Sequence, residues 1–373
     1  MDIYLWFDIV AVLVLGMVSA GVLIPKILLI SFRKRLFDRP DERKLHHCAV
    51  PRLGGMAFLP VIFFSLLLLT GVSLLMGDSR LHLQIGAEAT ELSFACCSLI
   101  VLYLVGIADD LIGVRYRAKF AVQILCGLFT VVSGLSVGSL FGVAGIGVLP
   151  LWAAWPLTVF IVVFIINAVN LIDGIDGLAS GLSAVALLFY GVELLSSGKY
   201  VCALLAFATL GTIIPFFYYN VFGNPQRGRK IFMGDTGSLT IGFILCYLSI
   251  QVARTVPEAG VSAECNRLIV AFSPLFIPCF DVVRVVIHRL RSGRSPFIAD
   301  KNHIHHKLLA VGMTQRQAMT VIIAAAIVFT LINIWLSRCV NVNVLLAADI
   351  LLYTAVNIRL TRRITKRGGS RIH

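Results

Sequence analysis

Long, uninterrupted apolar stretches recur along this chain of 373 residues and constrain its fold more than any other feature. Of all residues, 58% are hydrophobic and only 14% are charged, whereas about half and about a quarter are typical of soluble domains. A stretch of about 20 apolar residues is long enough to cross a bilayer as a helix, and the alternating pattern of a membrane β-barrel is absent. The sequence therefore predicts an all-α polytopic membrane protein.

The hydropathy pattern predicts about eleven transmembrane helices in one integral-membrane domain, residues 1–373. They are expected at 4–30, 55–77, 92–108, 119–136, 150–168, 178–196, 200–220, 237–254, 266–288, 317–337 and 344–360. Glycine and β-branched residues predominate in the connection at 137–150, which favours a short periplasmic β-hairpin. Pro274 and Pro278 should bend the ninth helix, which would either open a lateral groove for a lipid chain or leave a simple kink.

The balance of charge predicts the orientation in the membrane. The chain carries 32 Lys and Arg against 19 Asp and Glu, a formal net charge of +13. Most of the basic residues fall in alternate connections and in the tail 359–373, so the positive-inside rule places the N-terminus outside and the C-terminus in the cytoplasm. We expect a multi-pass protein of the bacterial inner membrane. Attraction to the anionic leaflet explains the basic tail, and no nucleic acid is needed as a partner.

Carboxylates gather on the predicted cytoplasmic side. Asn170, Asp173 and Asp176 follow one another at intervals of three residues, so on a helix they share one face. An ionised Asp at bilayer depth costs about 2.5–3.5 kcal/mol, and we therefore expect a cation, a polar ligand or a water-filled cavity beside them. Five more acids are expected at the same membrane face: Asp109, Asp110, Asp235, Asp281 and Asp300. This convergence predicts one shared site.

The acidic cluster calls for a cation, because converging carboxylates repel one another. Hard oxygen ligands suit Mg²⁺ or Mn²⁺. Mg²⁺ usually takes only one or two carboxylates and completes its shell with phosphate oxygens and water. Acids beside many basic groups therefore indicate a metal–phosphate substrate.

Basic and imidazole side chains supply the other half of the predicted site. They are Lys44, His46 and Arg52 in the first inner loop, Lys119 at the start of the fourth helix, and Arg294, His303, His305 and His306 in the fourth inner loop. The spacing of the three histidines matches no common zinc site, which favours contacts to phosphate or sugar. Lys119 either neutralises a phosphate or is a snorkelling membrane anchor.

Five motifs in order make the chain similar to the polyprenyl-phosphate N-acetylhexosamine-1-phosphate transferase family, glycosyltransferase family 4. They are PRLGG at 51–55, Asp109-Asp110 with Lys119 and Gln123, NAVNLIDGIDGLASG at 167–181, FMGDTGS at 232–238 and DKNHIHH at 300–306, within a family-like core at about 38–312. The resemblance implies that a sugar-1-phosphate moves from a UDP-N-acetylhexosamine to undecaprenyl or another polyprenyl phosphate, with Mg²⁺. The products would be UMP and a polyprenyl diphosphate sugar.

The histidine run narrows this resemblance. Ile304 interrupts the run, and in this respect the chain resembles the subgroup that uses UDP-N-acetylglucosamine rather than the translocase of peptidoglycan synthesis. Members of this subgroup start cell-surface polysaccharides such as O-antigen. The resemblance is also compatible with a homodimer.

The resemblance and the residue chemistry together imply roles. Asp235 should bind Mg²⁺, while Asp109 or Asp110 accepts a proton from the lipid phosphate or helps to hold the metal. Because adjacent helical residues point about 100° apart, these two should not do the same job. Lys119 should neutralise a phosphate. The expected substrate contacts are Asn170, Asp173, Asp176 and Asn220 on the nucleotide side, Phe232 either stacked on uracil or simply packed, and Lys44, His46, Arg52, Arg294, His303, His305 and His306.

Alternatives follow from the same residues. Direct attack of the lipid phosphate on the sugar-bearing phosphorus is preferred, and a two-step route through an aspartyl phosphate is its rival. A nucleotide-sugar or ion transporter would carry acids on both sides of an inverted repeat, and no such repeat is visible. An assembly scaffold would show no turnover. Asp349 lies in the expected eleventh helix, and its role is either a contact between helices or a proton site.

Overall fold

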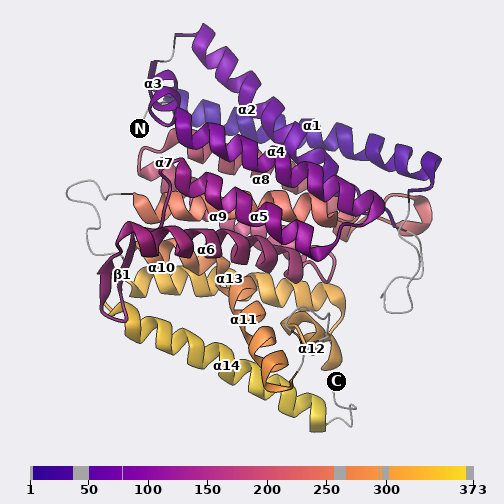
Figure 1. Cartoon of the computed structure of the whole chain (residues 1–373). Helices are drawn as coiled ribbons and strands as arrows, with labels where there is room; N and C mark the ends of the chain where they lie inside the picture. Colours follow the sequence, from indigo (N-terminus) through magenta and orange to yellow (C-terminus); the bar gives the residue numbers. More distant parts are fainter. Residues whose placement is uncertain are drawn as a thin grey trace.

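The computed structural model describes residues 3–36, 50–77, 79–255, 266–293, 295 and 302–366. These residues form an almost entirely helical bundle whose long helices run roughly side by side (Figure 1). The all-α prediction is confirmed. One end of the bundle contains the start of α1, α3 and the hairpin, and the other contains the end of α1, α12 and the end of α14.

The helices have the following bounds. They are α1 (Ile3–Lys34), η1 (Gly54–Ala57), α2 (Phe58–Leu75), α3 (Ser79–Ala87), α4 (Ala89–Ile112), α5 (Tyr116–Val132), α6 (Leu151–Ile172), α7 (Leu178–Ser196), α8 (Tyr200–Val221), η2 (Pro225–Arg227), α9 (Gly234–Arg254), α10 (Arg267–Phe272), η3 (Ser273–Leu275), α11 (Phe276–Arg291), α12 (Ile304–Ala310), α13 (Gln315–Leu336) and α14 (Val342–Lys366). Two short helices, α3 and α12, were not expected from the sequence.

Ten helical segments within the described residues are long and apolar enough to cross a membrane. The expected span at 119–136 corresponds to α5, which has 17 residues and is therefore about 26 Å long, slightly shorter than the hydrocarbon core. In Figure 1, α1 begins at one end of the bundle and α14 finishes at the other. The chain therefore traverses the bundle an odd number of times. The ten long apolar segments and α5 together give eleven traverses.

Helix α9 is the centre of the bundle. Every residue from Thr236 to Ala253 is buried, as expected for a helix that other helices surround. Two glycines, one on α4 and one on α9 itself, allow this close packing. A Cβ atom on Gly106 of α4 would lie 2.4 Å from the Cα atom of Thr236, and one on Gly242 of α9 would lie 2.9 Å from the Cα atom of Ile166 in α6.

The hairpin predicted near 137–150 is confirmed. Strands β1 (Ser139–Val143) and β2 (Ile146–Val148) pair in antiparallel fashion, with Ser139 opposite Val148. Two hydrogen bonds attach the hairpin to distant segments. The amide of Asn266 donates to the carbonyl oxygen of Phe141 (2.8 Å), and the backbone N–H of Ala144 donates to the side chain of Asn343 (2.7 Å).

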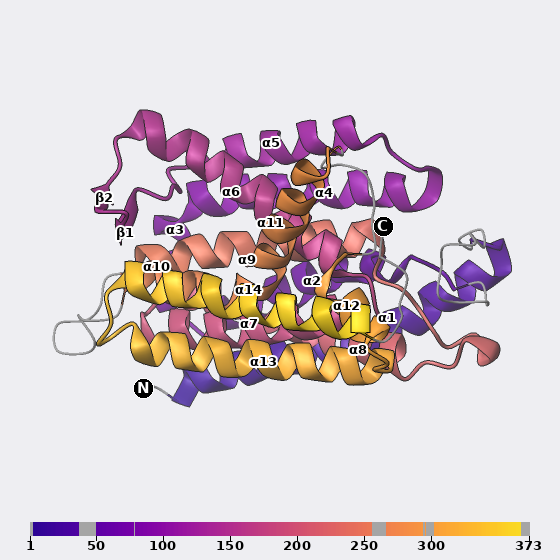
Figure 2. The ribbon, with the colours of Figure 1, turned by 90° about the horizontal axis from the view of Figure 1, so that it is seen from below.

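The bend predicted in the ninth span is also confirmed. Pro274 lies in η3, a 3₁₀ turn that separates α10 from α11, because proline removes a backbone donor and clashes with the preceding turn. Figures 1 and 2 show that α11 departs from the direction of α10 in both views. The groove that this bend might create for a lipid chain stays a prediction.

Polar contacts attach α14 to its neighbours at successive turns. Asp349 accepts a hydrogen bond from Asn333 of α13 (2.9 Å), which supports the inter-helix alternative for this acid. Lys307 of α12 donates to Asn357 (3.4 Å) and Thr361 (3.1 Å). The helix thus presents a polar stripe to the bundle, and this stripe faces α12 and α13.

Candidate active site

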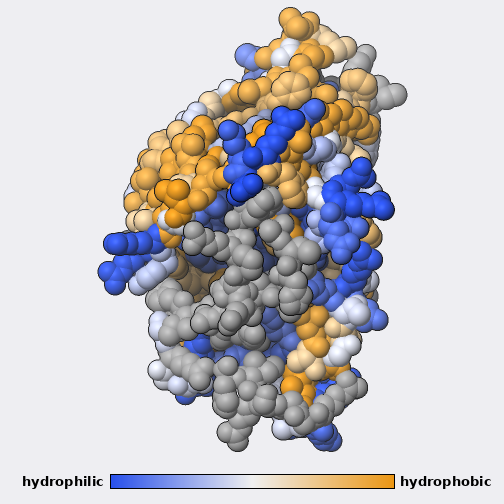
Figure 3. Space-filling view, turned by 90° about the vertical axis from the view of Figure 1, so that its right-hand side faces the viewer, coloured by the Kyte–Doolittle hydropathy of each residue, from blue (hydrophilic) through white to orange (hydrophobic). Residues whose placement is uncertain are grey.

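The predicted site residues that the structure describes lie at the end of the bundle where α4, α6 and α8 finish and where α7 and α9 begin; we call it the site end. Figure 3 shows this end of the molecule, with hydrophilic side chains gathered across it and apolar side chains along its upper flank. The segments that sequence analysis expected in the cytoplasm converge here, because the ends of α1 and α14 lie at the same end (Figure 1).

Three charged side chains from three different helices meet at the site end. The Lys119 Nζ atom of α5 lies 3.2 Å from Asp109 Oδ2 of α4 and 2.7 Å from Asp235 Oδ2 of α9. Their side chains are 23%, 16% and 24% exposed, respectively, so a ligand can reach them. We call these three residues the acid–lysine cluster. The structure thus brings together residues that are 116 positions apart in the chain.

Asn170 fixes the orientation of Asp235. Its side-chain nitrogen lies within 3.1 Å of Asp235 Oδ1 and 2.7 Å of Ser238 Oγ. Asn170 comes from the last turn of α6, while Asp235 and Ser238 come from the first turns of α9. One oxygen of Asp235 therefore accepts from an amide and the other from an ammonium group, which leaves little freedom of rotation for the carboxylate.

Asp110 has a different environment from its neighbour Asp109. Its Oδ1 atom accepts from the backbone N–H of Asp235 (2.8 Å), and its Oδ2 atom accepts from the N–H (2.9 Å) and the hydroxyl (2.6 Å) of Thr236. The carboxylate thus caps the N-terminus of α9, where a negative charge is favourable. The prediction that Asp109 and Asp110 do different jobs is consistent with this geometry. A direct role for Asp110 in metal binding or proton transfer stays a prediction.

Gly234 makes this cap possible. Its φ of +71° is in the left-handed region that favours glycine. A Cβ atom there would lie 2.1 Å from the carbonyl oxygen of Arg52 and 2.5 Å from Asp110 Oδ2. The glycine before Asp235 in the FMGDTGS motif is therefore required by the close approach of the Arg52 backbone and the Asp110 side chain.

The turn between α6 and α7 contains the next two predicted residues. Asp173 is open to solvent but surrounded by protein on several sides, and this desolvation, with the nearby charges of Asp176 and Asp235, raises its pKa to about 7; the charge of Arg52 acts in the opposite direction. Asp176 forms an ion pair with Lys230 at 2.5 Å. Asp173 is thus the less compensated acid of the two and the one that faces the open space.

Asn220 connects two loops of the site. It is buried, its side-chain oxygen accepts from the backbone N–H of Gly177 (2.6 Å), and its nitrogen donates to the carbonyl oxygen of Ile231 (2.8 Å). The amide therefore holds the start of α7 against the strand-like segment before α9. The direct substrate contact predicted for Asn220 stays a prediction.

Asp281 forms a separate set of contacts, and the expectation that it shares one site with the other acids stays a prediction. It is fully buried in α11. Its Oδ1 atom accepts from Arg284 (2.8 Å), from the backbone N–H of Ile304 (3.0 Å) and from the hydroxyl of Tyr353 (3.0 Å), while its Oδ2 atom lies 2.7 Å from His303 Nδ1. We call this set the Asp281 cluster. The sequence did not predict this cluster, because helical spacing cannot show which way an isolated acid faces.

The Asp281 cluster positions the histidines. Since Asp281 holds both His303 and the first backbone N–H of α12, it fixes where the next two histidines lie. The ring of His305 is 5.7 Å from that of His303 and 4.2 Å from that of His306, centroid to centroid. His303 therefore serves as a link in this network, and His305 and His306 extend beyond it.

His305 is the most unusual side chain of the site. It is only 1% exposed, and neither ring nitrogen has a hydrogen-bond partner in the part of the chain that the structure describes. The ring lies against the α6–α7 turn, because a Cβ atom on Gly174 would be 2.2 Å from its Nε2 atom. Burial, followed by the charges of His306 and His303, lowers its pKa to about 3. A neutral, buried ring with unused polar atoms beside Asp173 indicates a place for a polar ligand.

The remaining predicted residues divide into two groups. Arg52 and Phe232 lie at the site, because the backbone N–H of Phe232 donates to Pro51 and its carbonyl accepts from Gly54, both at 2.9 Å. The Lys230 ammonium lies 6.0 Å from the centre of the Phe232 ring, and stacking of this ring on a base stays a prediction. Lys44, His46, Arg294 and Asp300 are outside the described residues.

Sequence reasoning missed several residues that hold the site together. Thr236 and Ser238 lie in the FMGDTGS motif, so their position in the motif was a usable signal, whereas Lys230 was counted only as a basic loop residue. Tyr353 comes from a helix far along the chain, and no local pattern connects it with Asp281.

Comparison with known proteins gives consistent matches. The profile described as glycosyl transferase family 4 matches residues 92–253. The undecaprenyl-phosphate alpha-N-acetylglucosaminyl 1-phosphate transferase of Yersinia pestis is 33% identical over 309 residues, which covers 82% of this chain and 78% of the relative. The probable undecaprenyl-phosphate N-acetylglucosaminyl 1-phosphate transferase of Bacillus subtilis is 31% identical over 88% of this chain and 87% of the relative. The Escherichia coli K12 enzyme of the first name is 32% identical over 80% and 76%.

Proposed function

We propose that this chain, which belongs to glycosyl transferase family 4, transfers N-acetylglucosamine-1-phosphate from UDP-N-acetylglucosamine to undecaprenyl phosphate. The products are UMP and undecaprenyl diphosphate N-acetylglucosamine, a lipid on which a cell-surface polysaccharide can be started. One observation carries this proposal: Lys119 joins two carboxylates from different helices at an open end of the bundle, inside the region that the family profile matches.

We place the site end in the cytoplasm of a bacterial cell, with the helices in the inner membrane. The argument is the distribution of Lys and Arg, because the basic segments around 33–35, 115–119, 227–230 and 359–366 all lie at the site end (Figure 1), and basic loops are retained in the cytoplasm. A cytoplasmic site is also where a nucleotide sugar is available.

Mg²⁺ is the cofactor that we propose. Asp109 and Asp235 already converge on one cationic atom, the Nζ of Lys119. Among the described residues, no group of three or more His, Cys, Asp or Glu side chains could hold a metal unaided. This donor set fits Mg²⁺, which takes one or two protein carboxylates and completes its shell with phosphate oxygens and water. When bound, the ion would stabilise the negative charge of the phosphate groups.

The reaction needs neutralisation of charge more than it needs a strong base. Both substrates are anions, and their repulsion is amplified in a site of low dielectric. A phosphomonoester is already largely dianionic near neutral pH, because its second pKa is about 6. We propose that an oxygen of the lipid phosphate attacks the phosphorus that carries the sugar. A new P–O bond forms as the bond to UMP breaks, and UMP leaves with the electron pair.

The residues of the site divide this work. Lys119 provides fixed positive charge next to the reacting phosphates, while Asn170 keeps Asp235 in one orientation. Asp110 is a positioning residue, because the start of α9 uses both of its oxygens. Asp173 lies in the α6–α7 turn and His305 packs against the same turn at Gly174, and we propose that they bind the polar part of the nucleotide sugar.

Purified full-length protein in detergent tests the proposal. With Mg²⁺ and a short-chain polyprenyl phosphate, we expect UMP release to be fastest with UDP-N-acetylglucosamine among a panel of UDP-sugars. Lys119→Ala should lower turnover by about 10²-fold or more. Arg117→Ala removes a cation two residues away whose guanidinium group contacts the neighbouring Tyr116, and this control should remain active. Absence of UMP release with every UDP-sugar would overturn the proposal.

The order of the steps can be tested with the same protein. A burst of UMP in the absence of the lipid, with phosphosugar trapped on the chain, would replace the single-step mechanism with an aspartyl-phosphate intermediate. For the metal, Asp235→Asn should raise the Mg²⁺ concentration needed for half-maximal activity, whereas Asp349→Asn, far from the cluster, should not. Unchanged Mg²⁺ dependence of Asp235→Asn would remove this residue from the proposed ligands.

A further inference from the structure

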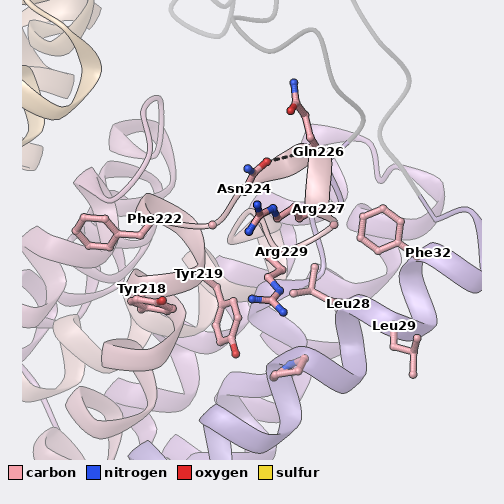
Figure 4. Close-up of a pocket in the computed structure, with 13 residues that line it drawn as sticks. Leu28, Leu29, Phe32, Tyr218, Tyr219, Phe222, Asn224, Gln226, Arg227 and Arg229 are labelled. Carbon is pink, nitrogen blue, oxygen red and sulfur yellow. Dashed lines mark hydrogen bonds between the residues drawn. The ribbon is translucent and has the colours of Figure 1, made fainter.

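A cavity lies at the site end, between α1 and the turn that follows α8 (Figure 4). Its volume is about 930 Å³, which is large enough for a sizeable ligand. The acid–lysine cluster is not part of its wall. The lining residues that carry the argument are Leu28, Leu29 and Phe32 of α1, Phe222 at the end of α8, and Arg227 and Arg229 of the turn.

One side of this cavity is apolar. Leu29 is 46% and Phe32 37% exposed on α1, while Tyr218 and Phe222 at the end of α8 are 60% and 56% exposed. Both helices are candidate membrane spans, and these residues lie in their last turns. The apolar wall is therefore at the depth where a bilayer changes from acyl chains to headgroups.

The other side of the cavity is cationic. Arg227 and Arg229 are exposed, and no hydrogen bond or ion pair of either guanidinium group is found with the rest of the chain that the structure describes. In Figure 4 the guanidinium group of Arg229 lies between Tyr219 and Leu28, with that of Arg227 next to it. Two uncompensated guanidinium groups thus lie beside an apolar wall, an arrangement complementary to a phosphate attached to hydrocarbon.

The turn that carries the two arginines is well ordered by its own contacts. The carbonyl oxygen of Asn224 accepts from the backbone N–H groups of both Arg227 (3.2 Å) and Arg229 (3.0 Å), while its side chain accepts from Gln226 (2.9 Å). A Cβ atom on Gly228, where φ is +62°, would lie 3.0 Å from the ring of Phe32, so the turn packs directly on α1. The backbone that carries the arginines is therefore ordered before any ligand arrives, which favours binding.

From this geometry we propose that the cavity is a binding site for one anionic phospholipid of the surrounding leaflet. Its phosphate pairs with Arg227 and Arg229, and its acyl chains lie along Leu29, Phe32 and Phe222. Basic pockets between membrane helices are suited to such headgroups. The cavity is separate from the site proposed for the reaction, so the lipid is a structural or regulatory ligand and the substrates bind elsewhere.

The same turn leads directly into the proposed active site. The residue that follows Arg229 is Lys230, which pairs with Asp176, and the next residue accepts the hydrogen bond of Asn220. A lipid that holds the turn against α1 would therefore also stabilise the segment that leads to Asp235. This predicts that the occupied protein resists thermal unfolding better than the lipid-free protein.

Native mass spectrometry of the full-length protein in detergent tests binding without any need for turnover. The probes are phosphatidylglycerol, which is anionic, and phosphatidylcholine, which is not. We expect one phosphatidylglycerol to be retained in preference to phosphatidylcholine, and Arg227→Gln with Arg229→Gln to weaken this binding by about fivefold for each arginine. The matched control is Arg362→Gln with Arg363→Gln, which removes the same charge from α14 at the site end and should keep the preference.

Three results would overturn the proposal. The first is equal retention of the two lipids by the wild-type protein, and the second is an unchanged preference for phosphatidylglycerol in the Arg227/Arg229 variant. The third is one-for-one displacement of phosphatidylglycerol by a short-chain polyprenyl phosphate, together with a raised KM for the polyprenyl phosphate in the same variant. The last result would assign the cavity to the lipid substrate. Because binding is read directly, these results are independent of whether the protein transfers a sugar phosphate.

Discussion

Two carboxylate clusters at the same end of this molecule differ in how completely their acids are satisfied. Asp281 is fully buried and receives hydrogen bonds from Arg284, Ile304, Tyr353 and His303. Asp235 is 24% exposed, and its carboxylate accepts hydrogen bonds from Asn170 and Lys119. A saturated carboxylate has no capacity left for a ligand, whereas an open one beside a cation can bind or react.

The difference teaches that burial, rather than the presence of an acid, separates a supporting cluster from a reactive one. The Asp281 cluster joins α11, α12 and α14 and thereby places His305 against the α6–α7 turn. The acid–lysine cluster joins α4, α5 and α9 and remains accessible. Removing the first should mainly reduce stability, and removing the second should mainly reduce turnover.

The largest effect is expected at Asp281. Asp281→Ala leaves Arg284 and His303 in a buried place without their acid, and loss of one partner from a buried ion pair costs about 3–5 kcal/mol. The free energy of unfolding, measured by titration of the detergent-purified protein with sodium dodecyl sulfate, should fall by this amount. Asp281→Asn, which keeps the shape, should lose less. If both variants were as stable as Asp349→Asn, Asp281 would not be a supporting residue.

Asp235 should show the opposite pattern. Asp235→Asn should lower turnover by about 10²–10³-fold, the size typical of losing one electrostatic group of an active site. Its pair with Lys119 is partly exposed, so the free energy of unfolding should change by less than about 1 kcal/mol. UMP release and the same unfolding titration measure the two quantities. Large losses in both would remove the distinction between the clusters.

A substitution at Tyr353 tests the same comparison with a smaller expected loss of stability. Tyr353→Phe deletes one donor to Asp281 and should reduce stability by about 1 kcal/mol. Because Asp281 also holds α12, the KM for the nucleotide sugar should rise while kcat stays nearly constant. Tyr190→Phe is the matched control, since its buried hydroxyl bonds to the carbonyl oxygen of Ala271 (2.6 Å). An equal change of KM in the control would make the effect at Tyr353 unspecific.

The smallest effect concerns pH. The pKa of Asp173 rises from 3.8 to about 7 in the folded protein, so the folded state binds this proton more tightly than the unfolded state does. The contribution of Asp173 to the free energy of unfolding is therefore fully present below about pH 4 and declines as the pH rises toward 7. The thermal midpoint of the wild type should be lower at pH 8 than at pH 5, and Asp173→Asn should narrow that gap. An unchanged gap would contradict the raised pKa.

Much of the fold was predictable from local pattern. Apolar stretches of sufficient length gave the spans, the glycine-rich segment gave the hairpin, and Pro274 gave the break between α10 and α11. Each of these depends on a property of neighbouring residues. The short helices α3 and α12 escaped because nine and seven residues carry too little periodicity to be recognised.

The site was predictable in its membership but only partly in its geometry. The motifs brought Asp109, Lys119, Asn170 and Asp235 into one hypothesis, and the structure places them within hydrogen-bonding distance of one another. The family expected from those motifs is confirmed by relatives about 32% identical over most of the chain. By contrast, the hydrogen-bond partners of Asp281 were not predictable, because an acid near a helix end can face either way.

The sequence alone determined that this chain crosses a membrane many times, where its basic loops gather and which motifs it carries, since hydropathy and charge are sums over neighbouring residues. Only the tertiary structure decided the partner of each acid. Asp110 meets α9 across 125 residues of chain and Tyr353 meets Asp281 across 72. A hydrogen bond requires its two atoms to approach within about 3 Å, and that condition is set by how helices distant in sequence pack together.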